Sequence, residues 1–341
     1  MRLHVVSLPH TQLTKDYSAC AYTEKVRKFS LMMRQRGHEV FTYASEDGDS
    51  VSCITKEQQA EFGFDGPEAY LKIDFNASEP WGTFNANVIA EMGKRLQPRD
   101  FVCLITGYPT KPIADAFPDN LSVEFGVGYS GTFSKYRVFE SNAWRNFVYG
   151  KYGEDGNFYD EVIPNYFEVN DFPAATPKDY YLYIGRLTDS KGWRLAQDIC
   201  ERLGVRLVVA GQGDFSGYGE YVGMVGPKER GELMSRAIAV FVPTLYVPPF
   251  EGVHIEANLC GTPVITSPFG VFQETVEDGF NGYKCGSMAE FLSAAQKVHL
   301  LDRPKIRENA ISKYSTDVIA ERYERYFEKL LTLWGNGFYA L

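Results

Sequence analysis

The sequence predicts an α/β protein with two doubly wound domains, each built on a parallel sheet. A strand-like run at 3–8, a helix-like run at 23–38 and a strand-like run at 38–45 form one βαβ unit, and a crossover of this kind joins parallel strands. The segment 162–179 contains three prolines and several polar residues, as linkers do. Beyond it, strand-like and helix-like runs alternate again, which indicates a second domain.

The remaining elements of the first half follow from their local patterns. The stretch 85–96 has apolar residues at helical spacing, and 100–106 is a continuous apolar run of the kind that buried parallel strands show. The stretch 121–153 is rich in glycine and aromatic residues and has little periodicity. It fits either ligand-facing loops or ordinary strands and turns, and the sequence leaves both open.

The second half repeats the alternation and closes with a long amphipathic helix. The expected strands are 180–185, 205–211, 221–226, 237–244 and 263–267, and the expected helices are 192–204, 228–237, a run from about 252, and 316–334. The chain therefore divides into domains 1–165 and 166–320 and a terminal helix, 321–341.

Composition and charge narrow the class of protein. The net charge of the 341 residues is −9, so a nucleic-acid partner would need a local basic patch against that field. The six cysteines form no CxxC pair, which indicates buried thiols in a reducing compartment and no metal site. No run approaches the ~20 apolar residues of a membrane span, and the first residues lack a signal-peptide pattern, so we expect a cytoplasmic protein.

The basic helix-like run at 23–38 allows two interpretations. Val26, Phe29 and Met33 lie on one side of it. Such a helix can lie on an anionic membrane, which would make the protein peripheral to a membrane surface. The favoured alternative is a first crossover helix whose basic face is in solvent.

The first candidate site lies where the expected strand 180–185 ends. Arg186 and Lys191 follow Gly185 in the loop "GRLTDSKG". Ligands of parallel sheets bind beyond the carboxyl ends of the strands, so both cations are placed to bind a diphosphate, the arginine as a forked donor and the lysine as a point charge. Alternatively, both are ordinary solvated loop residues.

The second candidate site follows the expected strand 237–244. Gly252 stands at the expected start of a helix, where unpaired N–H groups and the helix dipole attract anions. Glu256 lies one turn further, within reach of a sugar hydroxyl pair such as that of a ribose. The alternative is a glutamate that only complements the dipole. Its neighbours are apolar, so leaving Glu256 unpaired would be costly.

Four motifs, "YIGRL...KG", "VVAGQGD", "PPFEGVHIEANLCGTPVITSPFG" and "ETVEDGFNGY", occur in this order within 180–285. In order and spacing they resemble the carboxyl-terminal domain of retaining glycosyltransferases with the GT-B fold, glycosyltransferase family 4 (glycosyl transferases group 1). The resemblance implies two Rossmann-like domains that face a central cleft. The first reads the acceptor, the second binds a nucleotide-diphospho sugar, and the terminal helix crosses back to the first.

The resemblance also implies roles for individual residues. Arg186 and Lys191 match the pair that neutralises the donor diphosphate, and Glu256 matches the glutamate that holds the nucleotide ribose. His10 is a further catalytic candidate, as acid, base or oxyanion partner, and a loop histidine without a role is the alternative. The remaining donor-binding candidates are Pro9, Thr11, Gly185, Val225, Gly226, Glu251, Gly252, Val253 and His254, and weaker acceptor-binding candidates are Arg137, Glu140 and Trp144.

The chain departs from the family pattern at Pro248. The first glutamate of the family's E-x7-E motif, which touches the transferred sugar, would stand eight residues before Glu256, and Pro248 occupies that position. Glu251 lies three positions later. Either Glu251 substitutes for the missing glutamate through a reshaped loop, or the donor sugar is held differently, or transfer has been lost.

The implied reaction moves a sugar from a nucleotide-diphospho sugar to an acceptor hydroxyl with retention of configuration. A UDP-sugar is the favoured donor and a GDP-sugar the next, and the acceptor is a glycan, a lipid-linked sugar or another hydroxyl compound. Neither a metal nor another cofactor is expected. Asp47 and Asp49 have the spacing of a DxD metal motif, but they stand in a turn sequence, and GT-B enzymes generally do not use that motif.

Three other functions fit parts of the sequence. A viral-type DNA (hydroxymethylpyrimidine) glycosyltransferase shares this fold, but it would need a basic groove. A non-catalytic nucleotide-sugar binding module would account for Pro248. Sugar-nucleotide epimerases share the two-domain architecture, although "GRL...KG" and "EAN.CGTPV" favour transfer. The basic groove of the DNA glycosyltransferase alternative would be formed by Lys25, Arg27, Lys28, Arg34 and Lys135.

Overall fold

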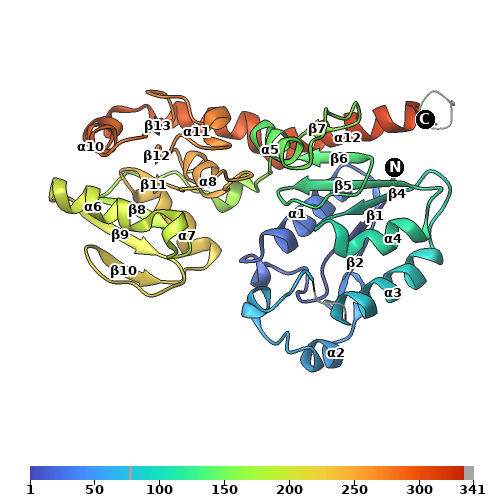
Figure 1. Ribbon diagram of the computed structural model, residues 1–341. Helices are drawn as coiled ribbons and strands as arrows, with labels where there is room; N and C mark the ends of the chain where they lie inside the picture. Colours follow the sequence, from blue (N-terminus) through green and yellow to red (C-terminus); the bar gives the residue numbers. More distant parts are fainter. Residues whose placement is uncertain (77–78, 334–341) are drawn as a thin grey trace. The chain divides into compact units, whose positions relative to one another are not determined.

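The computed structural model describes residues 1–76 and 79–333, and the chain forms two compact units (Figure 1). Unit 1 contains Met1–Glu140, Val148–Ile163 and the chain from Ile319, and unit 2 contains Ser141–Phe147 and Pro164–Val318. The main boundary falls inside the proline-containing segment that reads as a linker. The end of the expected terminal helix, 334–341, lies outside the described residues.

Unit 1 is built on a parallel sheet of seven strands in the order β3-β2-β1-β4-β5-β6-β7. Val5 of the central strand pairs with Thr42 on one side and Cys103 on the other, so the strand order reverses beside β1. Such a switch point places the loop after β1 where ligands of open α/β sheets bind. The strands are β1 (Arg2–Val6), β2 (Glu39–Ser45), β3 (Val51–Ile54), β4 (Phe101–Leu104), β5 (Leu121–Val127), β6 (Tyr136–Phe139) and β7 (Glu161–Val162).

The helices of unit 1 bury aromatic side chains against this sheet. Phe29 stacks on Phe125 of β5 with ring centroids 4.5 Å apart, and Tyr323 meets Phe29 edge-on at 5.0 Å. The last helix therefore contributes to the core of unit 1. The helices are α1 (Ala21–Gln35), α2 (Lys56–Glu61), α3 (Glu79–Gly93) and α4 (Lys111–Ala116), with 3₁₀ turns at Lys15–Tyr17, Pro67–Leu71 and Tyr108–Thr110. Two further helices, α5 (Asn142–Tyr152) and α12 (Thr316–Leu333), begin in unit 2 and end in unit 1.

Unit 2 is built on a second parallel sheet, with the order β10-β9-β8-β11-β12-β13. The strand order again reverses, here between β8 and β11. The strands are β8 (Tyr180–Ile184), β9 (Arg206–Ala210), β10 (Glu220–Gly223), β11 (Val240–Val242), β12 (Val264–Thr266) and β13 (Gly282–Lys284). The helices are α6 (Trp193–Leu203), α7 (Pro227–Arg236), α8 (Val253–Leu259), α9 (Phe272–Thr275), α10 (Met288–Lys297) and α11 (Arg303–Tyr314), with 3₁₀ turns at Val169–Asp171, Asp189–Lys191 and Val298–Leu300.

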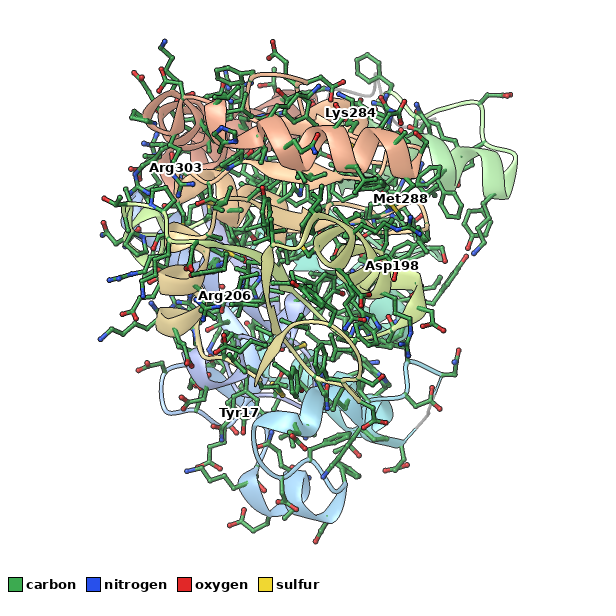
Figure 2. All side chains as sticks on the ribbon, turned by 90° about the vertical axis from the view of Figure 1, so that its left-hand side faces the viewer. Tyr17, Asp198, Arg206, Lys284, Met288 and Arg303 are labelled. Carbon is green, nitrogen blue, oxygen red and sulfur yellow. The ribbon has the colours of Figure 1, made fainter. Side chains whose placement is uncertain are left out.

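Both faces of the second sheet are covered. Along β8, Leu182 and Ile184 enter one apolar cluster, and Tyr181 and Tyr183 enter the other. This alternation is the two-residue period of a strand, and burial on both sides makes the strand a continuous apolar run. Side chains fill the layers between the ribbon elements (Figure 2). The two parallel sheets confirm the predicted α/β fold class.

The structure settles the stretch 121–153 in favour of ordinary elements, since it contains β5, β6 and α5. It also adds strands that the sequence interpretation missed, such as β3 and β13. These strands have four and three residues, too few for a period of two to stand out. All six cysteines are unpaired and buried, as their apolar surroundings indicate.

Most of the basic side chains expected to form a solvated face on 23–38 are bound in ion pairs. Lys25 pairs with Glu140, and Arg27 and Lys28 pair with Glu24; each of the three basic side chains is only 12% exposed. Because these cations bind neighbouring carboxylates, their side chains lie against the protein and are largely shielded from solvent. This corrects the expectation of a solvated basic face. The described residues contain no helix that is both long and apolar enough to cross a membrane.

Candidate functional site

The loops that follow β8 and β9 pack backbone against backbone. A side chain on Gly211 would place its Cβ 1.9 Å from the carbonyl oxygen of Gly185. The Tyr183 hydroxyl donates to the carbonyl of Arg186 at 2.8 Å, while the Arg186 side chain is exposed. The structure therefore places Arg186 at the carboxyl end of β8, as the sequence predicts.

Lys191 is bound to Glu251, which lies sixty residues further along the chain. Its ammonium contacts both carboxylate oxygens, Oε2 at 2.6 Å, and the two side chains are only 15% and 10% exposed. The Tyr246 hydroxyl donates to the same carboxylate at 3.3 Å, and its ring lies 5.2 Å from the Lys191 ammonium. Sequence reasoning named Lys191 and Glu251 separately and missed their pairing.

The loop before α8 is held on two sides. Pro248 packs on Gly270, where an added Cβ would lie 2.6 Å from the Pro248 ring. The Ser141 hydroxyl donates to the carbonyl of Pro249 at 2.6 Å. The two prolines thus form a rigid entry to the helix, and no carboxylate stands at position 248.

Glu256 lies on the first turn of α8 and forms an ion pair with Arg230 of α7. The side chain of Glu256 is 15% exposed and that of Arg230 is 33% exposed. A Cβ on Gly252 would lie 3.7 Å from Oε1 of Glu256, so this carboxylate borders the start of the helix. The helix has only seven residues, which limits its dipole. The sequence did not identify Arg230; the apolar flanks of Glu256 signalled only that a partner was needed.

His254 is a structural residue in this arrangement. Its side chain is fully buried, its Nδ1 lies 2.6 Å from the carbonyl oxygen of Glu251, and its Nε2 lies 2.7 Å from the Thr275 hydroxyl. Burial lowers the pKa of His254 to about 4. The imidazole therefore supports the turn at Glu251, and the expected donor contact at His254, which involves the backbone of the helix start, stays a prediction.

We expect His254 to make unit 2 acid-sensitive. Its folded pKa of about 4 lies below the ordinary 6.5, so the unfolded chain takes up the proton first as the pH falls. Stability is then full above about pH 6.5 and falls by about 1.4 kcal/mol per pH unit down to about pH 4. Urea unfolding of the wild type and of His254→Gln at pH 7 and pH 5 checks this. The difference between them should shrink at pH 5, and parallel pH profiles would contradict the assignment.

The residues proposed to lie near the nucleobase and the helix start occupy accessible positions. Gly226 is exposed and precedes α7, with open space where a Cβ would stand. Val225 and Val253 are half-buried and pack against the core of unit 2. Both residues remain partly exposed, which is compatible with a ligand at this edge of the sheet.

In unit 1, Pro9, His10 and Thr11 follow β1 and are buried. Burial lowers the pKa of His10 to about 4, and its Nε2 lies 3.7 Å from the sulfur of Cys20. The Thr11 hydroxyl contacts the hydroxyl of Thr23. A neutral imidazole at this position can exchange a proton only if a ligand reaches it.

Two of the acceptor candidates have structural partners. Arg137 is 5% exposed and donates to Asp160 and Glu154 at 2.7 Å each. This network holds β6 to the loop before β7, which corrects the expectation that Arg137 contacts an acceptor. Glu140 is buried against Lys25.

The third acceptor candidate, Trp144, is half-buried and stacks on Phe147 at 4.7 Å. Asp47 accepts hydrogen bonds from the backbone of Asp49 and Ser50, so this pair of acids forms a turn between β2 and β3. Among the described residues there is no cluster of three or more histidine, cysteine or acidic side chains arranged for a metal.

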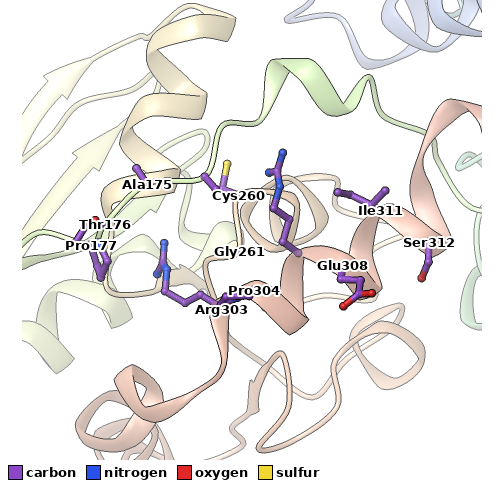
Figure 3. Close-up of a pocket in the computed structure, with 12 residues that line it drawn as sticks. Ala175, Thr176, Pro177, Cys260, Gly261, Arg303, Pro304, Glu308, Ile311 and Ser312 are labelled. Carbon is purple, nitrogen blue, oxygen red and sulfur yellow. The ribbon is translucent and has the colours of Figure 1, made fainter.

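A cavity of about 850 Å³ in unit 2 lies between the linker and α11 (Figure 3). None of the predicted site residues lines it. Arg303 and Arg307 border it, but both donate to backbone carbonyls, Arg303 to Ala237 and Ser235 and Arg307 to Phe172. The cavity therefore does not compete with the residues at the end of β8 as a site for an anion.

Residues 178–300 match the family model described as Glycosyl transferases group 1. An uncharacterized glycosyltransferase of Methanocaldococcus jannaschii is 34% identical over 118 residues, which are 30% of this chain and 30% of the relative. A solved glycosyltransferase involved in avilamycin A biosynthesis has a TM-score of 0.70 and 20% identity, over 97% of this chain and 98% of that one. Anabaena HepE in complex with UDP and glucose has a TM-score of 0.66 and 14% identity, over 98% and 100%.

The fold and these matches define the class of protein by its GT-B fold, which is the fold of the solved glycosyltransferases that it resembles. Within that class, residues 178–300 form a glycosyl transferases group 1 domain. The predicted GT-B fold is thus confirmed, the match of residues 178–300 agrees with the predicted glycosyltransferase, and the finer assignment to family 4 stays a prediction. The chain covers 30 to 36% of the length of the curated relatives that it matches.

Proposed function

We propose that this protein transfers a sugar from a nucleoside-diphospho sugar to an acceptor hydroxyl, with retention of configuration and without a metal. The observation that carries the proposal is that Arg186 and Lys191 both stand in the loop that follows β8. Cations at this edge of a parallel sheet suit a diphosphate. A UDP-sugar is the favoured donor, in line with the UDP and glucose bound to Anabaena HepE, and a GDP-sugar is the next.

The chemistry follows from where charge develops. The bond from the sugar to the diphosphate breaks, and negative charge grows on the leaving phosphate. Arg186 and Lys191 stabilise that charge more in the transition state than in the ground state, which lowers the barrier. Glu256, held by Arg230, accepts hydrogen bonds from the ribose, and the backbone around Gly226 borders the base.

The acceptor is a glycan, a lipid-linked sugar or another hydroxyl compound. A DNA acceptor is less well supported, because the helix expected to supply a basic groove has its Lys25, Arg27 and Lys28 side chains only 12% exposed and paired with carboxylates. Lys135, another residue named for that basic groove, has its ammonium 5.0 Å from the ring of Tyr159. The net charge of −9 also disfavours a DNA acceptor.

A second candidate function is a nucleotide-sugar binding module without transfer. Pro248, which stands where the family has its sugar-contacting glutamate, is the observation that favours it. Such a module would bind the same donors and release none of the sugar to any acceptor. Detection of transfer or of donor hydrolysis would rule it out.

The proposed function is tested by thermal unfolding with UDP, GDP, ADP, CDP and their sugar conjugates. A ligand at 100 times its dissociation constant adds about 2.7 kcal/mol to the free energy of unfolding, which raises Tm by several degrees. We expect one nucleoside diphosphate and its sugar conjugates to do so. Glu256→Ala should abolish the shift, whereas Glu308→Ala, an exposed glutamate on α11, should keep it. Wild-type protein that responds to none of these nucleotides would contradict the proposal.

A further inference from the structure

One of the two cations at the end of β8 already has a counter-ion. The Glu251 carboxylate binds the Lys191 ammonium through both oxygens, and the Tyr246 hydroxyl donates to it. The pair is mostly shielded from water, with side chains 10% and 15% exposed, so its attraction is screened less than that of a surface pair. Arg186 is exposed and has no such partner among its described side-chain contacts.

Glu251 is held in an unfavourable backbone conformation. Its φ is +62°, in the left-handed region that residues with a Cβ seldom adopt. The contact between Nδ1 of buried His254 and the Glu251 carbonyl, at 2.6 Å, fixes this turn. Strained residues of this kind persist where the surroundings hold them, and they cluster at ligand sites and switches.

The charges of Glu251 and Arg186 have opposite effects on the pKa of the Tyr183 hydroxyl. Burial raises the pKa of Tyr183 well above its ordinary value; Glu251 raises it further, and Arg186 opposes the increase. Since the same hydroxyl donates to the Arg186 carbonyl, Glu251 and Arg186 both lie close to the end of β8. A diphosphate that reaches Arg186 and Lys191 must therefore meet the Glu251 carboxylate there.

We propose that Glu251 is a displaceable internal counter-ion that occupies Lys191 until the donor diphosphate takes its place. This inference rests on the proposed function and adds a regulatory step to the same site. The donor then binds only to molecules in which the ion pair between Lys191 and Glu251 is broken. Because only a fraction of the molecules is in that state, the apparent affinity for the donor is lower than the intrinsic affinity, in proportion to that fraction. A diphosphate carries more charge than one carboxylate and binds Arg186 as well, so it displaces Glu251, while a weaker anion does not. After transfer, Glu251 returns to Lys191 and promotes release of the nucleoside diphosphate.

The experiment is isothermal titration of inorganic pyrophosphate into the full chain. Glu251→Gln keeps the shape of the side chain and removes its charge, and Glu251→Gly also relieves the left-handed backbone, so at least the second variant should fold. We expect both to bind pyrophosphate about tenfold more tightly than the wild type. In a Lys191→Met background, Glu251→Gln should bring no such gain. Glu308→Gln, which removes an equal charge on α11, should leave the wild-type affinity unchanged.

Equal or weaker pyrophosphate binding by both Glu251 variants overturns the inference, and so does a gain that persists without Lys191. Failure of the proposed function has a different signature. In that case the Glu251 variants still gain affinity for pyrophosphate in a Lys191-dependent manner, but no nucleoside-diphospho sugar stabilises the wild type.

Discussion

Replacing Arg186 by alanine is expected to lower the rate of sugar transfer about a hundred- to a thousandfold. Arg186 stands exposed at the carboxyl end of β8, and the proposed reaction needs a cation there when negative charge develops on the leaving phosphate. Removing one preorganised donor to such a charge typically costs about 3–4 kcal/mol in the barrier. The measurement is the steady-state rate of donor consumption with the sugar nucleotide that stabilises the wild type.

A matched control lies eight residues further along the chain. Arg194 is on the first turns of α6, is 59% exposed and pairs with Asp189 at 3.4 Å. Arg194→Ala removes the same charge from the same unit and should keep the rate within about twofold, because a surface ion pair contributes little. Arg186→Lys should lie between them, since lysine keeps the charge and loses the forked geometry. A rate in Arg186→Ala that matches the Arg194→Ala control would remove Arg186 from the reaction.

Replacing Gly192 by alanine is expected to destabilise unit 2 by about 3 kcal/mol or more. Gly192 has φ +72°, and a Cβ there would lie 2.1 Å from the carbonyl oxygen of Pro243. The obstacle is backbone, so it cannot turn away as a side chain can. Either the turn that carries Lys191 or the strand end before the two-proline loop must move.

Gly204 is the control for the backbone conformation alone. It ends α6 with φ +63°, and nothing lies within 4 Å of the position of an added Cβ. Gly204→Ala should therefore cost only about 1–2 kcal/mol, the penalty of the left-handed region. Urea unfolding measures both variants, and hydrogen exchange of 180–200 locates the change. Equal losses in the two variants would show that the approach of Pro243 is not what requires glycine at 192.

Much of this protein follows from local patterns in its sequence. The continuous apolar run of β8 and the period of α6 depend on neighbours along the chain, so the fold class could be predicted without tertiary information. The same applies to Arg186 and Lys191. A residue just after a strand of a parallel sheet lies at the ligand-binding edge, whatever the rest of the chain does. Elements of three or four residues, such as β3 and β13, carry too little pattern to be found this way.

The partners of charged residues could be known only from the tertiary structure. Lys191 meets Glu251, and Glu256 meets Arg230, across gaps of 60 and 26 residues. Arg137 looked like a binding residue and instead lies buried between two carboxylates. Attraction between charges depends on their separation in space and on their exposure to water, and neither can be read from the order of residues. The sequence therefore predicted the cations of the proposed site, while the folded chain determined which of them already have a counter-ion.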